Sequence, residues 1–519
     1  MTSSFALQFF LTCLSAVLYG LAFPPWRLWG LAWIALAPLL CALAGAGIGR
    51  AALLAWIWTM ALSLTVISWF GSDVADYFGQ GPWFGIVLFL VVPTITGAID
   101  YMAFAAVWSF SYRRLGHVSP LLTGAAWVSA ELGRSKLFFG NPWELAAYSQ
   151  VDAGPLIQIA DVTGIWGVSF LVAVVNGAVA GRFLEIRRDA PGRSRALHEA
   201  VLTVISVAIG MTLGGWRASA EHSSSDRANR AKVVTVQANL DVGMQWRREN
   251  YGQNFLENLQ LTQIGLRANP GAVAFWPENA MTFFVESDAA YRRSIASVLT
   301  PLGGELVAGG ARAMDPLRPE KEPFFNSAFS ISEDGSISAR YDKLDLLPFA
   351  ERFPIFGNAE FAERFSRVPE FTPGEPTSPL PTKAGRAGLL ICNEALFSEP
   401  ARARVRDGAE YLAVLANDGW SEDSPYGTTA LDMARVRAIE QRRWLVRTST
   451  SGPSAIVDPA GRIVAGVESD TRGWAAAEIE RRNQETPYAR FGDWFAWLCV
   501  AATATSTLAT ARGRSGHVR

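Results

Sequence analysis

Histidine is scarce in this chain and is missing from its largest hydrophilic segment. The four histidines among the 519 residues all lie outside residues 232–488, at His117, His198, His222 and His517. Cysteine and serine hydrolases that use an imidazole base need histidine, and most zinc sites need histidine or several cysteines. The hydrophilic segment therefore contains neither kind of site, and we expect no metal and no cofactor.

Cysteine is equally scarce. Three of the four cysteines, Cys13, Cys41 and Cys499, lie in long apolar stretches, and Cys392 alone belongs to the hydrophilic segment. A single thiol cannot form a disulfide within that segment. Because a free cysteine most often packs as a small inert hydrophobe, Cys392 becomes a candidate for chemistry only if its neighbours support it.

Neither sign of charge dominates the composition. The chain has 46 Lys and Arg against 47 Asp and Glu, which gives a net charge of -1 at pH 7. No basic stripe interleaved with aromatic residues occurs in it. We therefore exclude a nucleic-acid partner, which such a stripe would indicate.

Long apolar runs are abundant at both ends of the sequence. Half of the residues are hydrophobic, and they crowd the first 216 positions and the last 30. About 20 mostly uncharged residues are enough to cross about 30 Å of hydrocarbon. The sequence predicts eight membrane spans, of which the fifth is short: Phe5–Phe23, Leu28–Gly47, Ala51–Phe70, Trp83–Phe110, Ser119–Leu132, Gly164–Phe183, Ala200–Trp216 and Asp493–Ala511.

Basic residues predict how these spans are oriented, because short loops rich in Lys and Arg stay on the cytoplasmic side. With both termini cytoplasmic, 11 arginines fall in cytoplasmic loops and the tail, against three basic residues, Arg27, Arg134 and Lys136, in the opposite loops. We expect seven spans in residues 1–217, a catalytic domain outside the membrane in 221–488, an eighth span in 491–511 and a cytoplasmic tail in 512–519.

The hydrophilic segment has an α/β pattern, with short β-branched runs between helical windows at 248–268 and 427–443. Several runs are apolar throughout, as strands buried on both faces are. We expect a sheet covered by helices. The predicted strands are "KVVTVQANL", "GAVAFWP", "GELVAGGA", "NSAFSIS", "SISARYDK", "AGLLIC", "YLAVLAN", "WLVRTST" and "SAIVDP".

One stretch, 349–382, has little regular pattern and many aromatic and proline residues. Loops of this length inside a compact domain are usually functional. Two interpretations stay open: a lid that dips into lipid, and an ordinary packed insertion.

Ionisable residues follow three of the predicted strands. Cys392 ends "AGLLIC", Glu278 follows "AFWP" and Lys343 closes "SISARYDK". Taken singly, each has an ordinary alternative: an inert buried thiol, a carboxylate at a helix start and a solvated lysine. Together they suffice for covalent acyl transfer, because a lysine lowers the pKa of a nearby thiol, a buried carboxylate accepts its proton, and the ammonium faces the oxyanion.

The order Glu-Lys-Cys at three strand ends resembles the nitrilase superfamily of carbon–nitrogen hydrolases. Spans before and after the domain make the chain similar to the apolipoprotein N-acyltransferase family within it. The resemblance covers essentially the whole chain and includes the motifs "LAFPPW", "GNPWELAAYSQ", "TGIWGVSFL", "VQANLDVGMQW", "WPENA", "YDKLDLLPFAERFP", "ICNEALF" and "ANDGWSEDSPYG".

The resemblance implies a polytopic helical bundle joined to an αββα sandwich, and it implies site residues. Glu278 corresponds to the general base, Lys343 to the essential lysine that stabilises the oxyanion and thiolate, and Cys392 to the nucleophile. Supporting positions are Glu351, Glu394, Trp246, Trp420 and Asn393. Asn393 stands where the family often has Tyr, and "GTTALDMARVRA" lacks a histidine seen in many relatives, so the details of substrate contact stay open.

Charged residues also occur within the predicted bundle. Glu131, Arg134 and Asn141 resemble a family loop near the outer face, where a structural ion pair and turn is as good an interpretation as substrate contact. Asp100 lies near Pro93 in the fourth predicted span. An ionisable residue at mid-membrane is typical of transporters, so Asp100 alone favours a transporter or receptor.

The activity implied by the resemblance is a two-step exchange in the bacterial inner membrane, on its periplasmic side. Cys392 takes an acyl chain from a phospholipid and passes it to the α-amine of a diacylglyceryl-cysteine at the N-terminus of an apolipoprotein. The alternative is a membrane-tethered amidase or nitrilase that hydrolyses a soluble amide. Eight spans and the aromatic stretch favour the lipid substrate, since a soluble substrate needs only one anchor.

Overall fold

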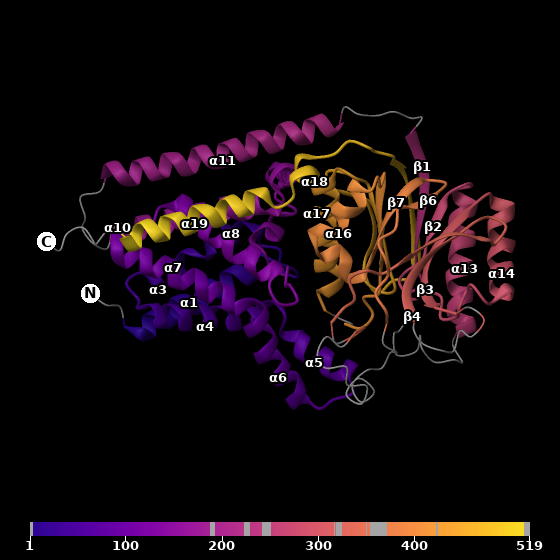
Figure 1. The fold of residues 1–519 in the computed structure, drawn as a ribbon, viewed down its shortest axis with the longest axis horizontal. Helices are drawn as coiled ribbons and strands as arrows, with labels where there is room; N and C mark the ends of the chain where they lie inside the picture. Colours follow the sequence, from indigo (N-terminus) through magenta and orange to yellow (C-terminus); the bar gives the residue numbers. More distant parts are fainter. Residues whose placement is uncertain are drawn as a thin grey trace. The chain divides into compact units, whose positions relative to one another are not determined.

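The computed structural model describes residues 4–186, 193–222, 229–240, 251–315, 317, 324–348, 350–352, 371–421 and 424–512. The chain divides into two compact units, Met1–Ala220 with Phe491–Arg519 and Glu221–Arg490 (Figure 1). The first is helical, and the second contains both sheets.

The helical unit consists mainly of apolar helices. Among the described residues, five helical stretches are long and apolar enough to cross a membrane: Ile48–Val66, Pro82–Leu115, Ile165–Ile186, His198–Ser219 and Trp494–Arg512. Phe5–Gly20 and Trp29–Leu43 are shorter apolar segments. Its helices are α1 (Phe5–Gly20), α2 (Ala32–Ala35), α3 (Ala37–Leu43), α4 (Ile48–Val66), α5 (Ser68–Tyr77), α6 (Pro82–Pro93), α7 (Ile99–Leu115), α8 (Pro120–Lys136), α9 (Ala160–Thr163), α10 (Ile165–Ile186), α11 (Arg193–His222) and α19 (Trp494–Arg512).

The predicted spans and the helices differ in several places, and the second predicted span, for example, is divided between α2 and α3. The third predicted span ends early, because helix α4 ends at Val66 and a separate helix, α5, begins after Ile67. The fifth corresponds to α8, a 17-residue helix that packs against α7, α10 and α19 and buries most of its residues. A helix surrounded by other helices does not need the uniform apolar surface that lipid requires, which explains its weak hydropathy signal.

The centre of the helical unit is aromatic. Trp58 packs edge-on against Tyr101 with ring centroids 5.1 Å apart, and Tyr101 stacks on Trp127 at 4.9 Å. Tyr19 joins them from α1, with its ring centroid 5.3 Å from that of Trp58. Such pairs contribute about 0.5–1.5 kcal/mol each beyond the area they bury.

Glu131, Arg134 and Asn141 have polar partners within the helical unit. Arg134 is 5% exposed and forms a 3.2 Å ion pair with Glu144. Glu131 accepts hydrogen bonds from the Trp127 indole at 2.8 Å and the Ala146 backbone N–H at 2.7 Å. The Asn141 amide donates to Thr96 at 2.9 Å. These contacts fit the interpretation of a structural ion pair and turn.

The second unit contains two mixed sheets, each with six strands in the described residues. One sheet has the order β12-β1-β2-β3-β4-β5, and the other β11-β10-β9-β8-β7-β6. The strands are β1 (Arg230–Gln237), β2 (Val273–Phe275), β3 (Glu305–Ala313), β4 (Phe324–Ile331), β5 (Ile337–Asp342), β6 (Leu380–Thr382), β7 (Gly385–Ile391), β8 (Tyr411–Ala416), β9 (Leu445–Ser449), β10 (Ser454–Val457), β11 (Ile463–Val467) and β12 (Gly473–Glu480).

The two sheets pack face to face with helices on both outer faces (Figure 1). Buried residues of both sheets, among them Phe275, Val307, Leu389 and Leu415, share one core. The helices α13 (Tyr251–Ala268) and α14 (Ala289–Leu299) cover the first sheet, and α16 (Ser398–Arg406) and α17 (Tyr426–Gln441) cover the second. The predicted αββα sandwich is confirmed. The short helix α18 (Pro487–Phe491) follows it.

All nine predicted strands are present, but β6, β11 and β12 were missed. β12 reads "GWAAAEIE", whose alanines and glutamates have low β-propensity. It is a strand because it pairs with β1 along its whole length, from Arg230 opposite Glu480 to Gln237 opposite Gly473. Tertiary pairing overrides local preference at this position.

Glycine allows one close approach that the sandwich needs. A Cβ on Gly309 of β3 would lie 2.5 Å from the Pro277 carbonyl oxygen and 2.7 Å from the Glu278 Cα. The Met281 N–H donates to the Gly309 carbonyl at 2.9 Å. The loop after β2 therefore rests directly on the backbone of β3.

We predict that Gly309→Ala lowers the free energy of unfolding by about 1–3 kcal/mol, because the added methyl group overpacks this contact. Thermal unfolding of the purified protein measures the effect. Gly252→Ala is the matched control, since a Cβ there meets no atom within 4 Å. Equal melting temperatures for the two variants would contradict the close approach.

Candidate active site

Cys392 lies directly after β7, where the strand turns into the short 3₁₀ helix Cys392–Leu396. Its φ is +51°, a left-handed conformation that costs a residue with a side chain about 1–2 kcal/mol. Strained backbone of this kind persists only where the surrounding structure holds it. The turn presents the sulfur at the end of the sheet.

Glu278 is reached through the Trp276-Pro277 turn after β2, and it is 4% exposed. Its Oε1 accepts a hydrogen bond from the Asn326 amide at 2.7 Å and lies 3.5 Å from the Lys343 Nζ. The Cys392 thiol also acts on this carboxylate and lowers its pKa. Three chain segments far apart in the sequence therefore converge on Glu278.

Lys343 follows β5 and is almost completely buried, with 1% of its surface exposed. Its Nζ is 2.8 Å from Glu351 Oε2 and 3.5 Å from Glu278 Oε1. The Gly374 N–H donates to the Lys343 carbonyl at 2.8 Å, and the Phe371 N–H donates to the Glu351 carbonyl at 2.9 Å. The described end of the 349–382 stretch is therefore packed on the lysine segment; its residues 353–370 are outside the described ones.

Asn326, which is not among the predicted site residues, joins the two carboxylates. Its Nδ2 donates to Glu278 Oε1 and to Glu351 Oε1, both at 2.7 Å, and the residue is 1% exposed. A polar amide inside the strand "NSAFSIS" was the available signal, since a buried amide needs partners.

Glu394 braces the segments that carry the thiol and the ammonium. Its Oε2 accepts from the Ile391 N–H at 2.7 Å, just before Cys392. Its Oε1 accepts from the Tyr341 hydroxyl at 2.8 Å and the Leu344 N–H at 2.9 Å, on either side of Lys343. This fully buried carboxylate links the turn after β7 to the end of β5.

Burial governs the protonation of the thiol. The pKa of Cys392 is raised above its ordinary value, first by burial and then by the charge of Glu278, whereas Lys343 and a hydrogen bond from the Asn417 backbone lower it. Lys343 lowers the pKa of Cys392, as the sequence predicts, but the net shift of the resting thiol is upward. The cost of burying a charged sulfur is larger than the effect of the ammonium.

The carboxylate and the ammonium are shifted in ways that complement each other. Burial raises the pKa of Glu278; Lys343 acts against this shift, and Glu351 adds to it. The pKa of Lys343 is raised despite its burial because Glu351 and Glu278 face it. The lysine therefore stays charged, and Glu278 is a carboxylate that exchanges a proton more readily than an exposed one does near neutral pH.

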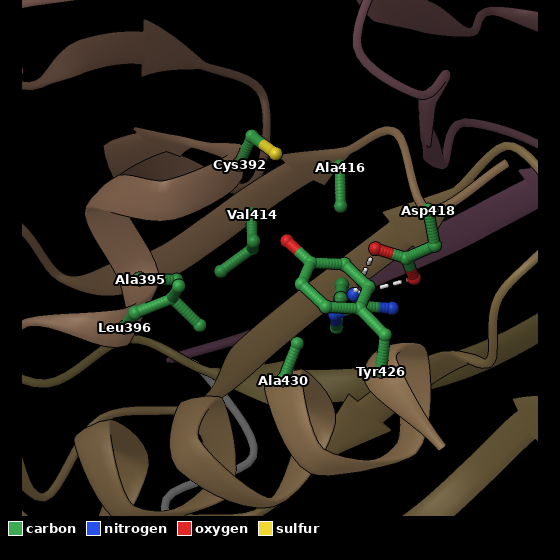
Figure 2. A pocket seen from close by; sticks show the side chains of 9 residues that line it. Cys392, Ala395, Leu396, Val414, Ala416, Asp418, Tyr426 and Ala430 are labelled. Atoms are coloured by element: carbon green, nitrogen blue, oxygen red, sulfur yellow. Dashed lines mark hydrogen bonds and ion pairs between the residues drawn. The ribbon is translucent and has the colours of Figure 1, made fainter. Parts of the chain in front are cut away.

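A small pocket adjoins the sulfur (Figure 2). Its apolar wall includes Val414 and Ala416 of β8. Tyr426 and Asp418 lie across the pocket from Cys392 (Figure 2). Neither Tyr426 nor Asp418 is among the site residues that the sequence predicts, although both belong to the motif "ANDGWSEDSPYG".

The remaining predicted residues are distributed around this group. The Asn393 amide donates to the Asp345 carbonyl at 3.0 Å and helps hold the segment after Lys343. Trp420 packs edge-on against Tyr426, with ring centroids 4.5 Å apart. Trp246 is outside the described residues. No group of three or more His, Cys, Asp or Glu able to hold a metal ion occurs in the part of the chain that the structure describes.

Comparison with known proteins matches both units. Residues 15–178 match the model of the apolipoprotein N-acyltransferase N-terminal domain, and residues 236–488 match the carbon-nitrogen hydrolase model. A relative named apolipoprotein N-acyltransferase, from Geobacter metallireducens, is 31% identical over 518 residues, which are 98% of this chain and 96% of the relative. The chain belongs to the apolipoprotein N-acyltransferase family.

Other apolipoprotein N-acyltransferases match over most of the chain. The relative from Bradyrhizobium diazoefficiens is 30% identical over 82% of this chain and 79% of its own length. The relative from Azotobacter vinelandii is 29% identical over 93% of this chain and 90% of its own length. As a member of this family the chain is an acyltransferase with a nitrilase-like domain, and its apolar helices make it a membrane protein.

We predict that Asn326→Leu slows acyl transfer by about tenfold to a hundredfold, since hydrogen bonds to charged groups contribute about 1.5–3 kcal/mol. Without the amide, Glu278 and Glu351 lose their shared donor. Steady-state rates with a fluorescent phospholipid donor measure the loss. Asn258→Leu, which replaces an equally buried asparagine of α13, is the control; the same loss in both variants would contradict a specific effect.

Proposed function

We propose that the protein is a phospholipid:apolipoprotein N-acyltransferase that works through a thioester on Cys392. The donor is a membrane phospholipid, and the acceptor is the α-amine of the N-terminal diacylglyceryl-cysteine of an apolipoprotein. The observation that carries the proposal is the convergence of a thiol, a buried carboxylate and a buried ammonium, in a segment (residues 232–488) without histidine, within a chain of this family.

In the first half-reaction the Cys392 sulfur attacks the ester carbonyl of the phospholipid, and its proton passes to Glu278. The electrostatic interaction between the thiol and Glu278 supports this path. The new S–C bond creates an oxyanion that the Lys343 ammonium and a backbone N–H beside Cys392 stabilise. The C–O bond then breaks, and Glu278 returns the proton to the oxygen of the departing lysophospholipid.

In the second half-reaction the acceptor amine attacks the thioester. The N–C bond forms, the amine proton passes to Glu278, and the S–C bond breaks with the electron pair on sulfur. Glu278 then gives its proton to the thiolate and restores the resting site. The raised pKa of Glu278 suits both directions of transfer, because such a group takes and returns a proton near neutral pH.

Membrane attachment suits this substrate pair. Donor and acceptor are both anchored in lipid, so an enzyme in the same membrane meets them in two dimensions. The basic residues of the short loops support cytoplasmic termini and a catalytic domain on the periplasmic side of the inner membrane. Residues 1–217 and 491–511 then form the spans, and residues 221–488 form the catalytic domain.

The thioester gives the sharpest prediction. Purified protein incubated with phospholipid gains the mass of one acyl chain at Cys392, and hydroxylamine removes it. Cys392→Ala abolishes both the adduct and the transfer, because no other group replaces the sulfur, while the protein stays in the membrane. Intact-mass and peptide-mass spectrometry measure the adduct. Retained transfer in Cys392→Ala would rule out the thioester, and an adduct formed with small amides alone would favour an amidase.

The pH dependence gives a second prediction. Because Glu278 must be unprotonated to accept the thiol proton and its pKa is raised, the rate of acyl-enzyme formation falls as pH drops through a value above the ordinary 4.5. Single-turnover rates across pH measure this limb. Glu278→Gln removes the base and lowers the rate by about 10²–10⁴-fold at every pH. An unchanged acidic limb in Glu278→Gln would assign it to another group.

A further inference from the structure

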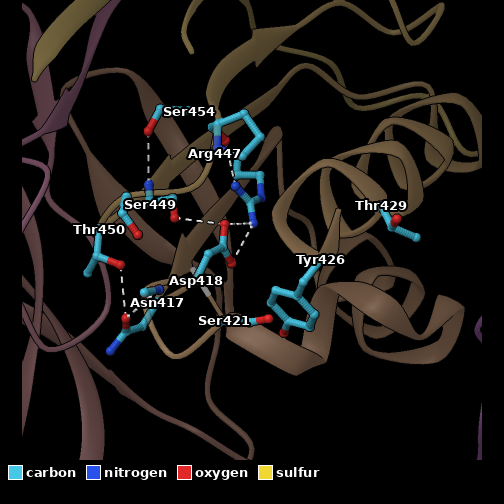
Figure 3. A network of polar contacts seen from close by, with 12 residues as sticks. Asn417, Asp418, Ser421, Tyr426, Thr429, Arg447, Ser449, Thr450 and Ser454 are labelled. Atoms are coloured by element: carbon cyan, nitrogen blue, oxygen red, sulfur yellow. Dashed lines mark hydrogen bonds and ion pairs between the residues drawn. The ribbon is translucent and has the colours of Figure 1, made fainter. Parts of the chain in front are cut away.

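A buried ion pair lies across the pocket from Cys392. Asp418 is 4% exposed and Arg447 is 1% exposed, and Arg447 Nη2 contacts both carboxylate oxygens of Asp418, at 2.7 and 3.0 Å (Figure 3). Ser449 donates to Asp418 at 2.8 Å. Arg447 Nη1 donates to the Pro453 carbonyl at 2.5 Å. The pair is thus hydrogen-bonded on both sides, as a buried pair must be.

The pair ties two segments together. Asp418 belongs to the loop after β8, and Arg447 belongs to β9. The neighbouring Asn417 is fixed to the same segment, since its Oδ1 accepts from the Thr450 hydroxyl at 2.9 Å. A Cβ on Gly452 would collide with the Asp418 carboxylate, so the fit is close. Figure 3 shows Thr450 and Ser449 side by side, facing Asn417 and Asp418.

The consequence for the site lies in the backbone of Asn417. β7 and β8 run parallel with Ile391 opposite Leu415, so Asn417 lies at the same end of the sheet as Cys392. The backbone N–H of Asn417 acts on the sulfur and lowers the pKa of the thiol. Asn417 and Asp418 are consecutive, so the contacts that hold both side chains also fix the direction of that N–H. Asp418 and Arg447 line the same pocket as Cys392, so the pair lies near the sulfur.

We propose that the Asp418–Arg447 pair, with Thr450, is a positioning element for the nucleophile: it holds the Asn417 N–H against the Cys392 sulfur. This inference rests on the proposed function only for the reaction step in which the Asn417 N–H stabilises charge on the sulfur. When the S–C bond of the thioester breaks, the electron pair stays on sulfur, and the N–H and Lys343 support that charge until Glu278 returns the proton.

The thiol itself gives a readout independent of acyl transfer. Iodoacetamide alkylates the thiolate, so its rate at Cys392 across pH reports how well the site supports charge on sulfur. The charged and titratable groups facing Cys392 are Glu278, Lys343, Asp418, Arg447 and Tyr426. Peptide-mass mapping of the full-length protein separates Cys392 from the three cysteines of the apolar helices.

We expect Arg447→Met to slow alkylation of Cys392 at pH 8 by about tenfold, which corresponds to a rise of about one unit in its pKa. Thr450→Val keeps nearly the same side-chain shape but removes the hydroxyl, and it slows alkylation of Cys392 by a smaller factor. Thr450→Ser keeps the donor and keeps the rate. The acyl-transfer rate falls in Arg447→Met and Thr450→Val, and the breakdown of the thioester slows with it.

Glu440→Gln is the matched control for stability. Glu440 and Arg437 form an equally buried pair on α17, with a 3.2 Å contact and full burial of both side chains. The control leaves alkylation unchanged even if its melting temperature falls. Folded Thr450→Val and Arg447→Met with wild-type alkylation profiles would overturn the inference, as would an equal loss in Glu440→Gln. Absence of acyl transfer in the wild type would instead refute the proposed function alone.

Discussion

The site depends on one ammonium buried between two carboxylates. Lys343 lies 2.8 Å from Glu351 and 3.5 Å from Glu278, and 1% of it is exposed. One positive and two negative charges leave this group one proton short of neutral, and the thiol of Cys392 lowers the pKa of Glu278. A buried charge on sulfur is costly, so the thiol keeps its proton at rest and gives it to Glu278 only during the reaction.

The fold serves that arrangement through strand ends and a few buried polar residues. β2, β5 and β7 each deliver one member, although they belong to two different sheets. Asn326 and Glu394 then hold the delivering segments together by hydrogen bonds of 2.7–2.9 Å. The raised pKa of Cys392 follows from this burial: the site favours a neutral thiol at rest, and charge on sulfur forms only when the carbonyl is attacked.

The sequence predicted what depends on local pattern. Apolar runs marked the helices, β-branched runs marked nine strands, and ionisable residues after strands marked Glu278, Lys343 and Cys392. It missed what depends on partners brought from elsewhere. β12 is a strand only because β1 pairs with it. Asn326 and Asp418 look ordinary until the carboxylates and the guanidinium they bind are in place. The raised pKa of the Cys392 thiol results from its burial in the folded protein, and no sequence motif encodes that burial.

The central claim is that the acyl group rests on Cys392 between two lipid substrates. Isolated acyl-enzyme mixed with a diacylglyceryl-cysteine peptide tests it most directly, with the α-amine free in one sample and acetylated in the other. The account predicts that one acyl chain per enzyme moves to the free amine and restores the mass of the unmodified protein, whereas the acetylated peptide takes none. Release of free fatty acid in both samples, with no acylated peptide, would contradict it.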